Sequence, residues 1–147
     1  MGQVATGTWS LNSNIMAKKP FDCPATFLDD PAPEWAVLVT NNTGKAAVVQ
    51  VYNSGTGKPL DTVLVVYNGT TFPASDAELK ACAQSADDCD DLTDVCGNVA
   101  NQGSTLDWAG MDDVAIPAGG SIIVVTNGYT SADTGPFNLN IKTKALN

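Results

Sequence analysis

Short apolar runs separated by Gly, Asn and Pro turns cover most of the chain. From Phe137 to Lys142, apolar and polar side chains alternate strictly, which is the period of a half-buried strand. Similar runs, rich in Val, Ile and Thr, are found at 5–11, 35–40, 46–52, 60–67, 111–117 and 121–126. About seven or eight short strands at this spacing favour an antiparallel β-sandwich of jelly-roll type. We therefore expect an all-β fold in one domain over residues 1–147.

One short helix is expected near residues 75–82, where Ser75 and Glu78 have the spacing of a capping box. Residues 12–33 show no period and carry four prolines, so they predict a long loop. The runs 35–40 and 46–52 flank an Asn-Asn-Thr-Gly turn and predict a β-hairpin.

Two of the expected strands, around Val63–Val66 and Ile122–Val125, are apolar on both faces. Their outer faces must be covered either by the long loops of the same chain or by a second copy of it, because exposed apolar patches and open edges favour association.

The charge balance limits the partners. Seven Lys, no Arg and no His stand against sixteen Asp and Glu, which gives a net charge of −9. Because phosphate binding needs clustered Lys and Arg, nucleic acid is excluded as a partner. We expect no membrane insertion, and the first residues lack the charged start of a signal peptide, so we expect a chain whose export signal was removed. Cations, neutral glycans and other proteins remain.

The residues for common catalytic mechanisms are missing. Without His there is no Ser-His-Asp triad, no Cys-His pair and no imidazole zinc ligand. Glu34 and Glu78 are the only Glu residues, and nothing in the sequence brings them together as the paired acids of a glycosidase. We therefore expect a protein that is not an enzyme.

Four cysteines, Cys23, Cys82, Cys89 and Cys96, form no Cys-x-x-Cys zinc knuckle. Their even number in an acidic chain predicts two disulfides and an oxidising compartment, so we expect a secreted or cell-surface protein. Three connectivities exist. We favour Cys82–Cys89, closing a small acidic loop, with Cys23–Cys96.

Carboxylates crowd this loop, on Asp87, Asp88, Asp90, Asp91 and Asp94. Like charges on a tethered loop repel one another, and a calcium ion with oxygen ligands would relieve the repulsion. The alternative is a solvated acidic loop held by disulfides. A weaker cluster, Asp107 with Asp112 and Asp113, is interpreted as ordinary turn and strand-edge residues.

Three aromatic residues beside predicted loops, Trp9, Trp108 and Tyr129, suggest a carbohydrate-binding surface, because neutral sugars stack on exposed rings. The competing interpretation is that the tryptophans pack in the core. Two sequons begin at Asn41 and Asn68. They would accept N-glycans in a eukaryotic secretory route, whereas in a bacterial protein they would be simple Asn/Gly turns.

Three segments carry a family resemblance: Leu60-Asp-Thr-Val-Leu-Val-Val-Tyr-Asn-Gly69, Val114–Val125 with its Pro-Ala-Gly-Gly turn, and Ala132–Asn140. In this order they resemble bacterial extracellular pre-peptidase C-terminal (PPC)-like modules and, more loosely, CUB domains, of the kind found in cell-surface proteins of gliding bacteria. The resemblance implies a non-catalytic jelly-roll-like sandwich. It also implies calcium ligands at Asp61 and Asp133.

The expected function is thus a secreted or cell-surface, non-catalytic module for adhesion, spacing or self-association, stabilised by calcium. Its partners would be itself or other surface proteins. One alternative is a carbohydrate-binding module. Another is a subunit of an extracellular fibre or coat, in which an edge strand pairs with the next copy.

Overall fold

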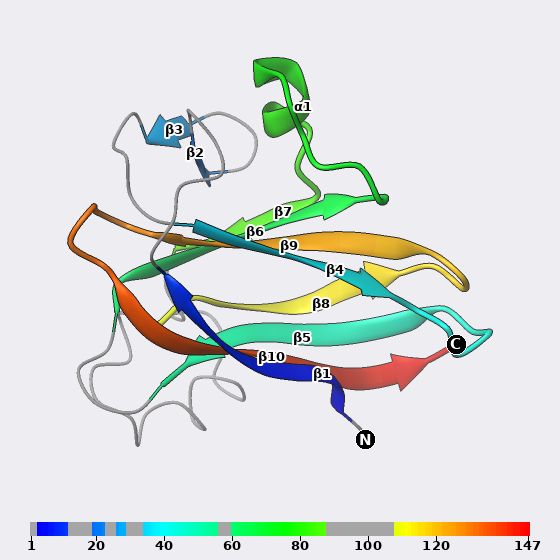
Figure 1. The fold of residues 1–147 in the computed structure, drawn as a ribbon. Coiled ribbons are helices and arrows are strands. Elements are labelled where there is room, and N and C mark those ends of the chain that lie inside the picture. The colour runs from blue at the N-terminus through cyan, green and yellow to red at the C-terminus, as the bar shows by residue number, and fades with distance from the viewer. Residues whose placement is uncertain (1–2, 12–18, 23–25, 29–33, 56–59, 88–107) are drawn as a thin grey trace.

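The computed structural model describes residues 3–11, 19–22, 26–28, 34–55, 60–87 and 108–147 as a β-sandwich with one short helix (Figure 1). The strands are β1 (Gln3–Leu11), β2 (Lys19–Asp22), β3 (Thr26–Leu28), β4 (Glu34–Thr40), β5 (Ala47–Ser54), β6 (Thr62–Asn68), β7 (Gln84–Ala86), β8 (Gly110–Ile116), β9 (Ser121–Gly128) and β10 (Gly135–Leu146). The helix α1 (Asp76–Lys80) lies between β6 and β7. The predicted all-β class is confirmed.

The sandwich has two four-stranded antiparallel sheets, in the orders β1-β10-β5-β8 and β4-β9-β6-β7, while β2 and β3 pair only with each other. Counting the eight sandwich strands along the chain, these orders become 1-8-3-6 and 2-7-4-5. This is the strand order of a jelly roll, in which neighbouring strands of each sheet come from distant parts of the chain. The predicted jelly-roll type is therefore confirmed.

The predicted hairpin between runs 35–40 and 46–52 is wrong. Strand β4 pairs with β9, placing Trp35 opposite Thr126, whereas β5 pairs with β10 and β8 in the other sheet. The turn after Thr40 therefore carries the chain from one sheet to the other. A local Asn/Gly turn signal is the same for both connections, so the sequence could not distinguish them.

The structure also adds strands that the pattern did not predict. Strands β2 and β3 lie within residues 12–33, which were expected to form a loop, and the three-residue β7 follows α1. The last strand runs from Gly135 to Leu146, well beyond its alternating segment, because it pairs with β1 on one side and β5 on the other.

The main core lies between the two sheets. The alternating residues Phe137, Leu139 and Ile141 are buried there, as their pattern predicted, facing Leu64 and Val124 of the second sheet. The inward side chains of β5, β8, β6 and β9 complete the cluster. This core fixes the register of both sheets, because a one-residue slip would expose every inward side chain.

A second apolar cluster covers the outer face of the β4-β9-β6-β7 sheet. Val63, Val65 and Val125 are buried there beneath Leu79 of α1. The hydroxyl of Tyr67 donates a hydrogen bond to the Leu79 carbonyl oxygen at 3.1 Å, and burial of the ring raises the pKa of Tyr67. The two-faced apolar runs are thus covered, at these residues, by the chain itself.

The predicted capping box is present at the start of α1. The Ser75 Oγ accepts a hydrogen bond from the Glu78 backbone N–H at 3.3 Å, and the Glu78 Oε2 accepts one from the Ser75 N–H at 2.9 Å. Hydrogen bonds to the Glu78 carboxylate from the Ala74 N–H and from the hydroxyl and N–H of Ser75 lower the pKa of Glu78. The capping box lets a helix of only five residues form in place over the sheet.

Candidate functional site

Several turns meet at the end of the sandwich where the C-terminus lies (Figure 1). They surround a groove of about 740 Å³. Its floor is apolar, formed by Ala47 and Val48 of β5 with Ala115, Ile116 and Pro117 at the end of β8. Polar groups at its rim come from Asn68, Ser121 and Asn147.

Asn41 holds this end of the molecule together. Its side chain is only 3% exposed, and its Nδ2 donates to the carbonyl oxygens of Lys45 at 2.7 Å, Ile116 at 3.1 Å and Pro117 at 3.0 Å. Its Oδ1 accepts from both the N–H and the hydroxyl of Thr43. One amide therefore ties the turn after β4 to the turn after β8 and sets the shape of the groove wall.

The two predicted sequons consequently differ. Asn41 has no free amide nitrogen to carry a glycan in the folded protein, whereas Asn68 is exposed at the end of β6, next to Gly69 with a φ of 102°. The sequence showed both as Asn in turns. The long-range bonds of Asn41 could not be read from it, and neither could the groove.

Among the residues that the structure describes, no ionisable side chain lines the groove, although the chain has a net charge of −9. A charged ligand would therefore lose its hydration there without a counter-charge, which is costly. A concave apolar floor with a few polar groups at the rim is the usual form of a binding site for a small or extended uncharged ligand.

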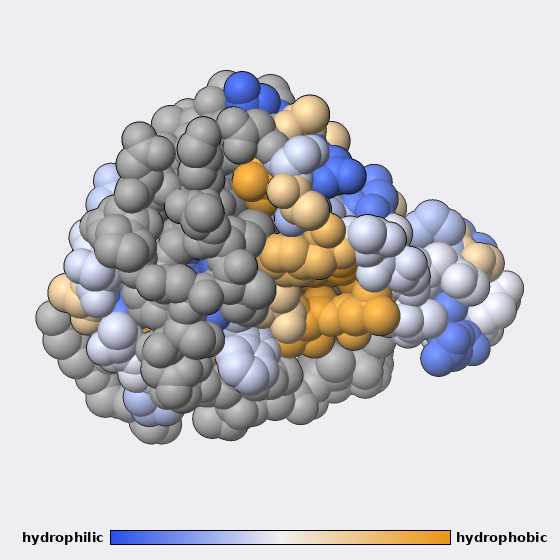
Figure 2. Space-filling view, turned by 45° about the horizontal axis from the view of Figure 1, so that its top comes forward, coloured by the Kyte–Doolittle hydropathy of each residue, from blue (hydrophilic) through white to orange (hydrophobic). Residues whose placement is uncertain are grey.

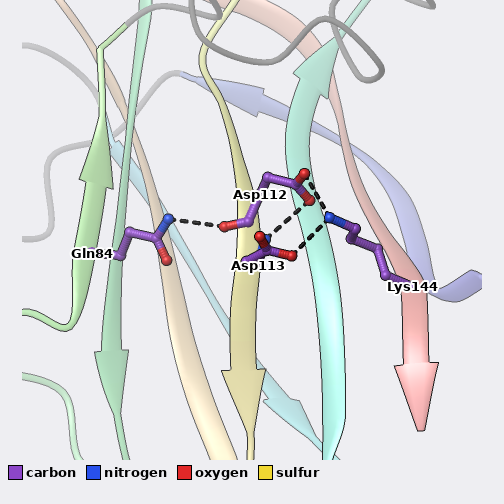
Figure 3. Close-up of polar contacts among 4 residues, drawn as sticks. All are labelled: Gln84, Asp112, Asp113 and Lys144. Carbon is purple, nitrogen blue, oxygen red and sulfur yellow. Dashed lines mark hydrogen bonds and ion pairs between the residues drawn. The ribbon is translucent and has the colours of Figure 1, made fainter.

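The acids Asp112 and Asp113 lie on β8, where both side chains contact Lys144 of β10 (Figure 3). The Lys144 Nζ donates to Asp112 Oδ2 at 2.6 Å and to Asp113 Oδ1 at 2.7 Å. Although burial alone would raise it, the pKa of Asp112 lies below its ordinary value because of the hydrogen bond from Lys144. The same contacts raise the pKa of Lys144.

These two acids also form a β-bulge. Val49 pairs with Val114 and Val51 with Met111, so Gln50 alone faces both aspartates. Asp113 adopts a φ of 55°, and the Asp112 carbonyl oxygen accepts a hydrogen bond from Gln84 Nε2 of β7 at 3.0 Å. The prediction that they are strand-edge residues is confirmed; Asp107 lies outside the described residues.

Asp61 and Asp133, the acids that the resemblance assigns to calcium, do lie next to each other. The Asp61 N–H donates to Asp133 Oδ1 at 3.3 Å, while the Thr130 N–H and hydroxyl donate to Asp133 Oδ2 at 2.8 and 2.7 Å. Asp133 thus closes the turn between β9 and β10 and ties it to β6. Among the described residues, no three His, Cys, Asp or Glu side chains gather as a metal site would require.

The acidic loop is mostly beyond the described residues. Asp87 is half-buried at the end of β7, and Asp88, Asp90, Asp91 and Asp94 fall outside. Among the cysteines, only Cys82 is described; it is half-buried and is not a free thiol. Cys23, Cys89 and Cys96 fall outside, so both disulfide pairings remain predictions.

The aromatic surface expected for sugars is not formed as predicted. Trp108 is 1% exposed and belongs to the main core, packed so closely that a Cβ added at Gly55 would lie 2.9 Å from its ring. The role of Trp108 as a sugar-stacking residue is therefore wrong, because an enclosed indole has no free face. Trp9 lies on β1 opposite Phe137, and Tyr129 is 37% exposed.

Across the described residues, no helix has the length and apolar character that crossing a bilayer requires. No family model, curated protein or solved structure matches the chain. The likeness to PPC and CUB modules accordingly remains a prediction from the sequence.

Proposed function

We propose that this protein is a secreted or cell-surface, non-catalytic module that acts through contact with other molecules, in adhesion, spacing or self-association. The observation that carries the proposal is the groove without ionisable side chains in a chain with a net charge of −9. A concave surface whose described lining has no ionisable side chain favours an uncharged partner.

The chemistry of the groove favours a neutral glycan. Ring C–H groups would pack on the accessible apolar lining at Val48, Ala115 and Pro117. Sugar hydroxyls would exchange hydrogen bonds with the Asn68 amide and the Ser121 hydroxyl. This second candidate function, carbohydrate binding, keeps the sequence-based hypothesis but moves its site from Trp108 to the groove.

The extracellular setting and the calcium stabilisation rest on the sequence alone. Four cysteines with an acidic loop between them support disulfides in an oxidising compartment, and calcium would lower the repulsion among the loop carboxylates. Unfolding in calcium and again in chelator tests the ion separately from the groove, because only a bound ion raises the midpoint.

The groove is tested by screening the protein on an array of neutral glycans and measuring any hit by calorimetry. Ala115→Lys adds a long charged side chain to the groove wall and should abolish binding, while Ala115→Ser should retain it. Ala115 is exposed, so both variants should fold. Absence of any neutral-glycan binding by the wild type, or full binding by Ala115→Lys, would reject the groove as the contact site.

A further inference from the structure

The edge strands of the sandwich differ in how well they are protected against pairing with another chain. An unpaired edge offers free N–H and C=O groups, and natural proteins block it with short strands, bulges or charges. Strand β7 has only three residues, β8 carries the bulge with Asp112 and Asp113, and β1 has an irregular register between Gln3 and Ala5. Strand β4 has no bulge, and its one acid, Glu34, is buried at its first residue, so among these described edges the second half of β4 is the stretch without such a device.

Strand β4 is regular along its whole length. Its seven residues pair with β9 one by one, from Glu34 opposite Asn127 to Thr40 opposite Ser121, without a shift in register. No residue from Trp35 to Thr40 is charged, and the run is rich in Val. Such a segment has the composition of strands that readily add to one another.

The second half of β4 is also open to solvent. Leu38 is 53% exposed, the largest value among the exposed large apolar residues of the described chain, whereas its neighbour Ile123 on β9 is 4% exposed. Leu38 lies on the outer face of the sheet, since Val39 points into the main core. The view that brings this face forward shows apolar side chains gathered there beside the grey atoms (Figure 2).

We propose that β4 pairs with β4 of a second copy of this chain, antiparallel about a two-fold axis through Leu38. The two β4-β9-β6-β7 sheets then become one continuous sheet. This inference rests on the proposed contact function and deepens it by naming the partner for self-association.

The register follows from exposure. With Leu38 opposite Leu38 of the second copy, Val37 faces Val39 and Ala36 faces Thr40, so the pairing uses the open half of β4. Directly opposed residues have Cβ atoms about 4.5–5.5 Å apart, close enough for the two leucines to cover each other. A two-fold axis makes the same patch serve both copies, as in most homodimers.

A second copy fits this edge better than a charged segment. A charged strand would meet no counter-charge between Trp35 and Thr40, whereas a second β4 brings an uncharged, β-prone run of equal length. The interface is small, so the dimer should be weak and concentration-dependent. Because each copy carries a charge of −9, added salt should strengthen it by screening.

Sedimentation velocity from about 10 µM to about 1 mM covers the affinities expected of a small interface. Wild type should shift from monomer to dimer with concentration, and more so at higher salt. Leu38→Lys should weaken dimerisation at least about tenfold, because a charge on an edge opposes strand addition. Ala115→Lys on β8 should dimerise like wild type, and circular dichroism should show native β-structure for both.

The two proposals fail separately. Leu38→Lys should keep glycan binding and lose the dimer, while Ala115→Lys should lose glycan binding and keep the dimer. Leu38→Thr, which retains strand propensity, serves as a milder second variant with an intermediate loss. A wild type that stays monomeric throughout, or a Leu38→Lys dimer as strong as wild type, would overturn the β4 pairing whatever the groove binds.

Discussion

Strands β4 and β8 are both edge strands of seven residues, one in each sheet, yet they face their surroundings in opposite ways. The edge at β8 is bent by a bulge and carries two carboxylates, and its Asp112 carbonyl oxygen accepts a hydrogen bond from the Gln84 side chain. The edge at β4 is straight, has no charged residue from Trp35 to Thr40, and is exposed at Leu38. Strand length and sheet position therefore do not decide whether an edge is protected; local backbone conformation and charge do.

The same contrast describes the whole molecule. Several charged side chains connect parts of the structure: Lys144 pairs with Asp112 and Asp113, and Asp133 accepts hydrogen bonds within the turn between β9 and β10. Ionisable side chains are absent from the described lining of the groove and from Trp35 to Thr40 of β4. In a chain with a net charge of −9, neutral surfaces are where another molecule can approach without repulsion, and this supports a function based on contact.

The largest expected effect on stability comes from Asn41, whose side chain connects the end of β4 to the end of β8. Asn41 follows β4 and bonds the carbonyl oxygens that end β8, so Asn41→Ala removes a buried amide and leaves its partners unsatisfied. We expect a loss of about 2–4 kcal/mol in the free energy of unfolding, measured with urea. Asn68→Ala, the matched change at the exposed sequon, should cost less than about 0.5 kcal/mol. Equal losses in the two variants would refute the structural role of Asn41.

A smaller effect is expected at the bulge of β8. Asp113 has a φ of 55°, which a β-branched residue tolerates poorly. Asp113→Val should therefore lower the free energy of unfolding by about 1–2 kcal/mol more than Asp113→Asn, because Asn adopts this conformation readily. Urea unfolding of the two variants separates strain from loss of the ion pair, since both remove the carboxylate. Identical stability would show that the bulge does not constrain the residue.

The smallest effect concerns the pH dependence of the ion pairs on β8. The pKa of Asp112 is lowered from 3.8, so its stabilising effect is present above that value and is lost as pH falls through the folded pKa. The pKa of Lys144 is raised from 10.5, so its effect is present below that value and is lost as pH rises through the folded pKa. The difference in unfolding temperature between wild type and Lys144→Met should be constant between these limits and shrink outside them. A constant difference down to the lowest pH would contradict the pairing.

The sequence predicted those parts of the fold that depend on local pattern. The alternation from Phe137 to Lys142 and the capping box at Ser75 were present in short windows of sequence, and the number and spacing of such windows predicted the jelly-roll class. It could not show that β4 pairs with β9, because a turn signal does not reveal which sheet the next strand joins.

The candidate site was harder to predict, for a related reason. Asn41 and Pro117 are 76 positions apart, and only the folded sandwich brings them together. The exposure of Leu38 and the burial of Trp108 likewise depend on which strands flank them, and for Trp108 the sequence left both a sugar-stacking role and core packing open. The long-range hydrogen bonds of a single polar residue in a turn, such as Asn41, therefore cannot be predicted from the residues next to it in the sequence.

The most direct test of the difference between the edges is a cysteine trap at Leu38. In the proposed register, Leu38→Cys faces itself across the two-fold axis at a Cα separation of about 4.5–5.5 Å, within reach of a disulfide. Under mild oxidation this variant should form a covalent dimer on a non-reducing gel, and Ala115→Cys on β8 should remain monomeric. Equal cross-linking of both variants, or none for Leu38→Cys at millimolar protein, would contradict an open edge at β4.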